Sequence, residues 1–192
     1  MIAEQSGKQN SVLVAISLIG TLAFSWLYMQ WTHELGHILT GLATGAELDR
    51  VILNPLKFSM TQFASNPRPH ITTWGGPVLG VLIGAGVPML LICLIKRHQF
   101  SLRIVAAFVL LANGLYIGLG AITPFADAQE LIEYGSPRWL LAVFGLACCI
   151  AARAILAPVL NGPSHLPTGR EQVLFALLTF TLAALGFLVF NE

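Results

Sequence analysis

The sequence predicts an all-α membrane protein: a bundle of about five transmembrane helices with a short strand-like or re-entrant insertion after the first. Of the 192 residues, 56% are hydrophobic and only 10% are charged, and the mean hydropathy is +0.77. Soluble domains carry about 25% charged residues, so this chain lacks the polar surface that would face water on all sides. Its length leaves room for a single membrane-embedded domain over residues 1–192.

Five stretches are apolar over about 20 residues, the length that crosses a bilayer as a helix. The first is the longest, because helix is expected to continue past the apolar residues until Gly45 can end it. We expect this first span to be retained as an uncleaved anchor that is tilted or emerges into a wet cavity. The predicted spans are residues 11–44, 72–95, 102–122, 139–156 and 172–190.

Between the first two spans, residues 46–70 form the only long stretch of mixed polarity. Pro55, Pro67 and Pro69 break any helix there, so short strands or a re-entrant loop are expected. An extended strand beside a cleft could offer its edge to a bound peptide. A surface linker is the alternative interpretation of the same residues.

The sequence His-Glu-Leu-Gly-His at residues 33–37 follows the apolar run 11–28. On a helix, positions i and i+4 share a face, so His33 and His37 can hold one metal ion. Glu34 lies beside that face, within reach of a metal-bound water that it could deprotonate as general base. A five-residue pattern can recur by chance, but polar clusters are costly in hydrocarbon and therefore indicate a functional site.

A catalytic zinc ion takes three protein ligands and keeps one position open, so a third ligand is needed. Asp127 stands out because it follows the third span closely, behind Pro124, with small residues on both sides. Glu130, one helical turn later, is the alternative ligand. Either acid could instead serve only as a favourable charge at a helix N-terminus.

Two further features lie inside the spans. Gly76, Gly80 and Gly84 recur at every fourth residue, a pattern typical of close helix packing; bare backbone there could also bind substrate. Asn113 is a polar residue within the third span. It could stabilise an oxyanion or contact the substrate, or it could make an interhelical hydrogen bond.

The His-Glu-Leu-Gly-His sequence at 33–37, Gly-Gly-Pro at 75–77 and Asp127 together resemble the site-2-protease (M50) group of intramembrane zinc metalloproteases. Residues 125–131, followed by Gly-Ser-Pro at 135–137, are most similar to the M50B-like branch of that group.

This resemblance covers residues 20–140. It implies Zn²⁺ held by His33, His37 and Asp127, with Glu34 as general base and a strand-like insertion after the first helix. The implied activity is hydrolysis of peptide bonds in a membrane protein or peptide substrate, within or beside the lipid bilayer.

The sequence therefore predicts a multi-pass integral membrane protease, which we expect in a bacterial inner membrane. The net charge of +1 and the lack of a long basic run exclude a nucleic-acid surface. A non-proteolytic membrane binding or assembly protein that retains a metal site is the alternative. Haem is disfavoured, because haem is normally held between histidines of different helices, whereas His33 and His37 share one.

Overall fold

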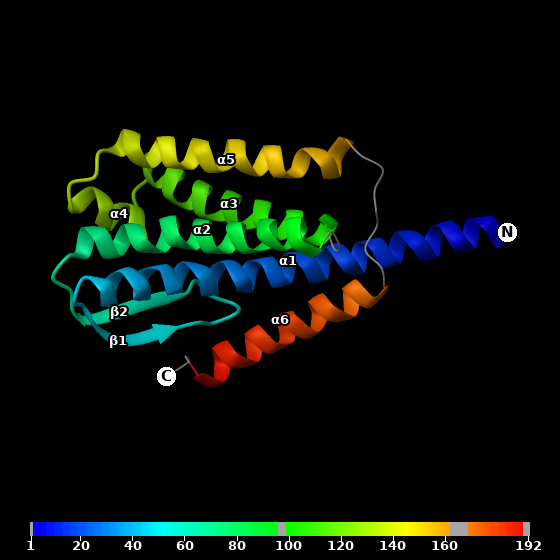
Figure 1. Cartoon of the computed structure of the whole chain (residues 1–192), viewed down its shortest axis with the longest axis horizontal. Helices are drawn as coiled ribbons and strands as arrows, with labels where there is room; N and C mark the ends of the chain where they lie inside the picture. The colour runs from blue at the N-terminus through cyan, green and yellow to red at the C-terminus, as the bar shows by residue number, and fades with distance from the viewer. Residues whose placement is uncertain (1, 96–98, 162–168, 190–192) are drawn as a thin grey trace.

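The computed structural model describes residues 2–95, 99–161 and 169–189 of the chain (Figure 1). Within these residues the chain forms six helices and one two-stranded sheet. In chain order the elements are α1 (Ile2–Ala43), β1 (Glu47–Ile52), β2 (Met60–Ser65), α2 (Pro69–Ile95), α3 (Gln99–Gly120), α4 (Ala126–Glu133), α5 (Arg138–Asn161) and α6 (Gly169–Val189).

Three helices in the described part of the chain are long and apolar enough to cross a membrane: α2, α3 and α5. They coincide with the second, third and fourth predicted spans, with ends that differ by up to five residues. The prediction of five spans is thus matched only in part. The first and fifth fall on α1 and α6, and these two spans stay predictions. In α6 the described residues include an apolar stretch over Val173–Leu188.

Helices α1, α2 and α3 pack against one another, and α5 covers the far side of α3 (Figure 1). The contact of α3 with α5 is built from small and apolar side chains, Ala106, Leu110, Cys148 and Ala152 among them. Helix α6 packs against α1 on the side where the hairpin lies (Figure 1). A Cβ at Gly186 of α6 would come within 2.7 Å of the Leu53 carbonyl oxygen, so α6 also closes against the hairpin.

The insertion is a hairpin, as one of the two interpretations of residues 46–70 predicted. Strands β1 and β2 pair antiparallel, with Val51 opposite Thr61. Helix α1 ends as the sequence predicted, at a glycine with a positive φ of 84°. The amide of Gly45 bonds to the Leu42 carbonyl and that of Ala46 to the Gly41 carbonyl, which is the Schellman arrangement. This ending turns the chain back, so that the hairpin lies beside α1.

Candidate metal centre

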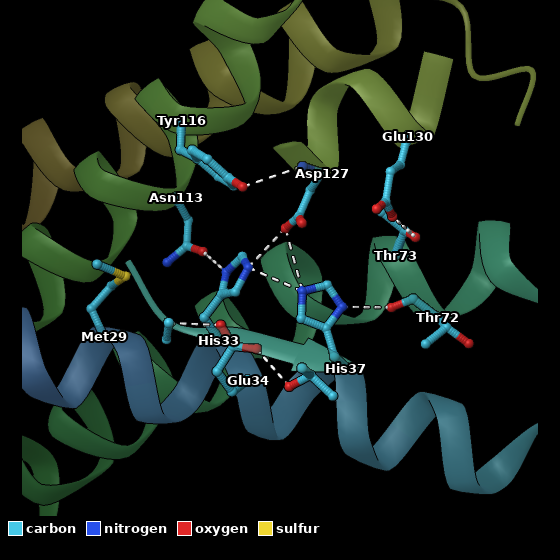
Figure 2. Close-up of polar contacts among 12 residues, drawn as sticks. Met29, His33, Glu34, His37, Thr72, Thr73, Asn113, Tyr116, Asp127 and Glu130 are labelled. Carbon is cyan, nitrogen blue, oxygen red and sulfur yellow. Dashed lines mark hydrogen bonds and ion pairs between the residues drawn. The ribbon is translucent and has the colours of Figure 1, made fainter. Parts of the chain in front are cut away.

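Two histidines of α1 and one aspartate of α4 converge beneath the short helix α4 (Figure 2). The Nε2 atoms of His33 and His37 lie 3.1 Å apart. Asp127 Oδ2 lies 2.9 Å from the first and 3.3 Å from the second. Both imidazoles are buried, and the expectation that His33 and His37 share one helix face is met.

Helix α4 carries Asp127 into this group. Ala128 and Leu131 are fully buried against Ile117 of α3 and Leu141 of α5, and this small cluster fixes the helix. Ala126, directly before the aspartate, has a φ of 43°, a left-handed conformation that is uncommon for a residue other than glycine.

Asp127 is held in its ionised form. Its backbone N–H donates to the Tyr116 hydroxyl at 3.2 Å. Burial alone would raise the pKa of the Asp127 carboxyl, but without a metal ion, when the imidazoles carry protons on Nε2, hydrogen bonds from His33 and His37 and their charges hold this pKa well below its ordinary value. The carboxylate is therefore available as a ligand at neutral pH.

The second ring nitrogen of each histidine is held by its own partner. Nδ1 of His37 lies 2.9 Å from the Thr72 carbonyl oxygen, which can only accept, so Nδ1 is the donor. Nδ1 of His33 lies 2.7 Å from Asn113 Oδ1. The Asn113 amide donates to the Val109 carbonyl oxygen at 3.0 Å, which fixes its orientation and makes His33 Nδ1 a donor too.

The donor set fits a metal ion. With the protons on Nδ1, two Nε2 lone pairs and a carboxylate oxygen face one another, an arrangement that needs a cation between them. Ligand atoms bound at 2.0–2.1 Å to a tetrahedral zinc ion lie about 3.3 Å apart, and the separations here are 2.9, 3.1 and 3.3 Å. Two histidines and one carboxylate are a set known for catalytic zinc, and they leave one position open.

The two candidate third ligands occupy different places. Asp127 joins the histidines, whereas the Glu130 carboxylate accepts a hydrogen bond from the Thr73 hydroxyl at 3.1 Å (Figure 2). Asn113 makes the interhelical hydrogen bond that was one of its two predicted roles, and it acts on His33 by fixing the ring. Its role as a substrate or oxyanion contact stays a prediction.

The glycines of α2 provide room for the histidines. A Cβ at Gly76 would overlap His37 Nε2, and a Cβ at Gly80 would lie 3.0 Å from the His33 Cα. Gly36 of α1 meets the Gly75 carbonyl group equally closely. Of the two roles predicted for this glycine pattern, close helix packing is the one observed, and Gly76 also leaves the space that the His37 ring fills.

Replacing Gly76 by Ala should therefore push the His37 ring out of position and weaken zinc binding by about 10- to 100-fold. Competition with a chromophoric chelator measures this affinity. Gly86→Ala in the same helix is the matched control, because a Cβ there meets nothing within 4 Å. Equal zinc affinity in the two variants would contradict the packing argument.

Glu34 lies next to the metal group but does not belong to it. Its side chain is buried, and both carboxylate oxygens accept hydrogen bonds from hydroxyl groups of the hairpin, those of Ser59 and Thr61. The sequence analysis did not identify these two residues, nor Thr72 or Tyr116. Thr72 acts through its backbone carbonyl, which no side-chain pattern indicates. Ser59 and Thr61 could have been found, because two hydroxyl residues at alternate positions of an extended segment point to the same side.

The metal group and Glu34 open onto one cavity of about 1170 Å³, lined by α1, the hairpin, α3 and α4. Cavities for small ligands typically measure about 300–1,000 Å³, so this one has room for several residues of a peptide. Residues 60–63 of β2 form part of its wall.

A family model described as Peptidase M50B-like matches residues 11–118, more than half of the chain. The match includes the 33–37 motif, the hairpin and Asn113, and it ends before Asp127. No curated protein and no solved structure matches the chain.

Proposed function

The chain belongs to the M50B-like peptidase family, and we propose that it is an intramembrane zinc metalloprotease that hydrolyses peptide bonds of membrane proteins or peptides. The observation that carries the proposal is the His33–His37–Asp127 group beside the buried Glu34 carboxylate, in a cavity large enough for a peptide. The group could hold a metal ion, and zinc is the ion that this donor set and the family favour.

In this mechanism His33, His37 and Asp127 would hold the ion, and Asn113 and the Thr72 carbonyl keep the two imidazoles in the orientation that ligation requires. A bound zinc ion would supply a Lewis acid that polarises the scissile carbonyl and lowers the pKa of water toward about 7. Glu34 takes a proton from the attacking water as the new carbon–oxygen bond forms. It returns that proton to the amide nitrogen as the carbon–nitrogen bond breaks, which yields an acid and an amine.

The substrate must be extended where it is cut, because a helix hides its peptide bonds in internal hydrogen bonds. We propose that the cleaved segment lies along β2, whose residues 60–63 face the cavity. A strand edge can pair with an extended peptide through main-chain hydrogen bonds.

The surface supports a place in a lipid bilayer, which we propose to be a bacterial inner membrane. Large apolar side chains are exposed along the two outer helices α2 and α5, for example Leu82, Leu90, Val143 and Ile150. Exposed apolar area of this extent is unfavourable in water and favourable against lipid chains.

Removal of the metal tests the proposal. We expect the purified, reconstituted protein to carry about one zinc ion per chain and to cut a panel of single-span peptides, with products identified by mass spectrometry. Chelation should abolish cleavage, and added zinc should restore it, because no side chain of the site replaces the Lewis acid. Unchanged cleavage by protein shown to be free of metal would refute the proposed mechanism.

A further inference from the structure

We propose that Ser59 and Thr61 of the hairpin are positioning residues for the general base Glu34, so that the hairpin is a working part of the catalytic site. The inference rests on the proposed function, because it concerns the base of that reaction. It gives the hairpin a second role, the positioning of Glu34, in addition to the proposed contact of β2 with the substrate.

The contacts are of the strong kind. Ser59 Oγ donates to one carboxylate oxygen of Glu34 at 2.7 Å, and Thr61 Oγ1 donates to the other at 2.6 Å. Both lengths lie at the short end of the range for hydrogen bonds between oxygen atoms. One donor on each oxygen fixes the plane of the carboxylate. Each oxygen keeps another lone pair, so Glu34 can still accept a proton.

The extended chain delivers both hydroxyls to the same side: Thr61 lies in β2, and Ser59 directly precedes this strand. Side chains two positions apart in an extended chain point to one face, and Met60 between them is 44% exposed. Thr61 is also held by the sheet, where it pairs with Val51 of β1. The two donors therefore move only if the hairpin moves.

Helix α1 ties the hairpin to the face that carries the base. The Trp26 indole N–H donates to the Pro55 carbonyl oxygen at 3.0 Å, and the Gln30 amide donates to the Lys57 carbonyl oxygen at 2.7 Å. Trp26, Gln30 and Glu34 follow at four-residue intervals and so share one face of the helix. One helix face thus sets the distance between the base and its two donors.

A purely structural role is the competing explanation, since a buried carboxylate is unfavourable without hydrogen-bond donors. That role predicts a loss of stability alone. Positioning predicts in addition a selective loss in kcat, because a misplaced base slows proton transfer without changing how the substrate binds.

The kinetic test uses Ser59→Ala and Thr61→Val, singly and together, in the zinc-loaded protein. We expect kcat to fall on the order of ten-fold for each single variant and further for the double variant. KM should change less than about two-fold. Thr61→Ser, which keeps the hydroxyl, should recover most of the activity lost in Thr61→Val. The control Thr181→Val removes an exposed hydroxyl of α6 that does not line the cavity and should leave kcat unchanged.

A wild-type kcat in the folded, zinc-loaded double variant would overturn the proposal. So would a fall in kcat that Thr61→Ser does not recover. Glu34→Gln in the same assay separates the two hypotheses: if that variant cleaves normally, the proposed function fails, whatever the hairpin variants do.

A second measurement does not depend on proteolysis. In detergent, Thr61→Val should lower the Tm by about 3 °C when Glu34 is present and by much less in a Glu34→Ala background. Such a coupling demonstrates the hydroxyl–carboxylate bond directly. Equal shifts in the two backgrounds would show that the contact is not made and would overturn the proposal.

Discussion

Replacing Glu34 by Gln is expected to abolish peptide-bond hydrolysis while the protein keeps its fold and its zinc. The amide has nearly the shape of the carboxylate. Its oxygen can still accept from one hairpin hydroxyl, and the other hydroxyl can rotate to accept from the amide NH2 group, so the fold of the hairpin is altered little. It cannot take a proton from water. General-base catalysis contributes about 10²–10⁴-fold, and kcat should fall by at least the lower figure. Single-turnover cleavage of a peptide by the reconstituted variant measures the loss of hydrolysis, and metal analysis of the same protein sample shows whether zinc is retained.

Glu47→Gln is the matched control for this change, because it removes an exposed carboxylate of β1 that does not line the cavity. Its cleavage rate should equal that of the wild type. If Glu34→Gln instead retained the full biological activity of the protein, hydrolysis would not be its function. The chain would then be a membrane binding or assembly protein that keeps a metal site.

The helical scaffold follows from the sequence where local rules decide the outcome. Three spans are predictable because apolar runs of this length have few alternatives in a membrane protein. The end of α1 is predictable because Gly45 adopts the left-handed conformation that stops a helix. The first span is less sharply bounded in the sequence, since helix α1 continues past the apolar residues through the metal motif.

The two histidine ligands of the metal centre are easier to predict from the sequence than the aspartate ligand. The spacing of His33 and His37 places them together without any tertiary information. The position of Asp127 depends on a contact between α4 and the buried faces of α3 and α5, and sequence spacing alone could not separate it from Glu130. The parts that sequence analysis missed are the outer contacts: the Thr72 carbonyl and the hairpin hydroxyls are placed entirely by long-range packing.

Loss of Asp127 is expected to have the second large effect. Asp127→Ala leaves two ligands, and it also leaves two histidine lone pairs 3.1 Å apart without the negative charge that favours a cation between them. Removing a residue that only hydrogen-bonds to a metal ligand typically weakens metal binding by up to about 100-fold. Loss of the ligand Asp127 itself should lower zinc affinity by more than this, and cleavage should be lost as well. Metal analysis of the purified variant, by mass spectrometry at limiting free zinc, checks the first part.

Glu130→Ala and Glu133→Ala make this test specific. Glu133 is an exposed acid of the same short helix, so its loss reports any general effect of removing negative charge near the site. Glu130 bonds to Thr73 and stands apart from the histidines, so its loss should leave about one zinc ion per chain. If zinc remained in Asp127→Ala and disappeared in Glu130→Ala, the third ligand would be Glu130. Asp127 and Glu130 are three residues apart, and their side chains therefore point about 60° apart around the helix. In that case α4 would have to turn by about 60° to bring Glu130 inward, which would break the buried contacts of Ala128 and Leu131 that fix the helix here.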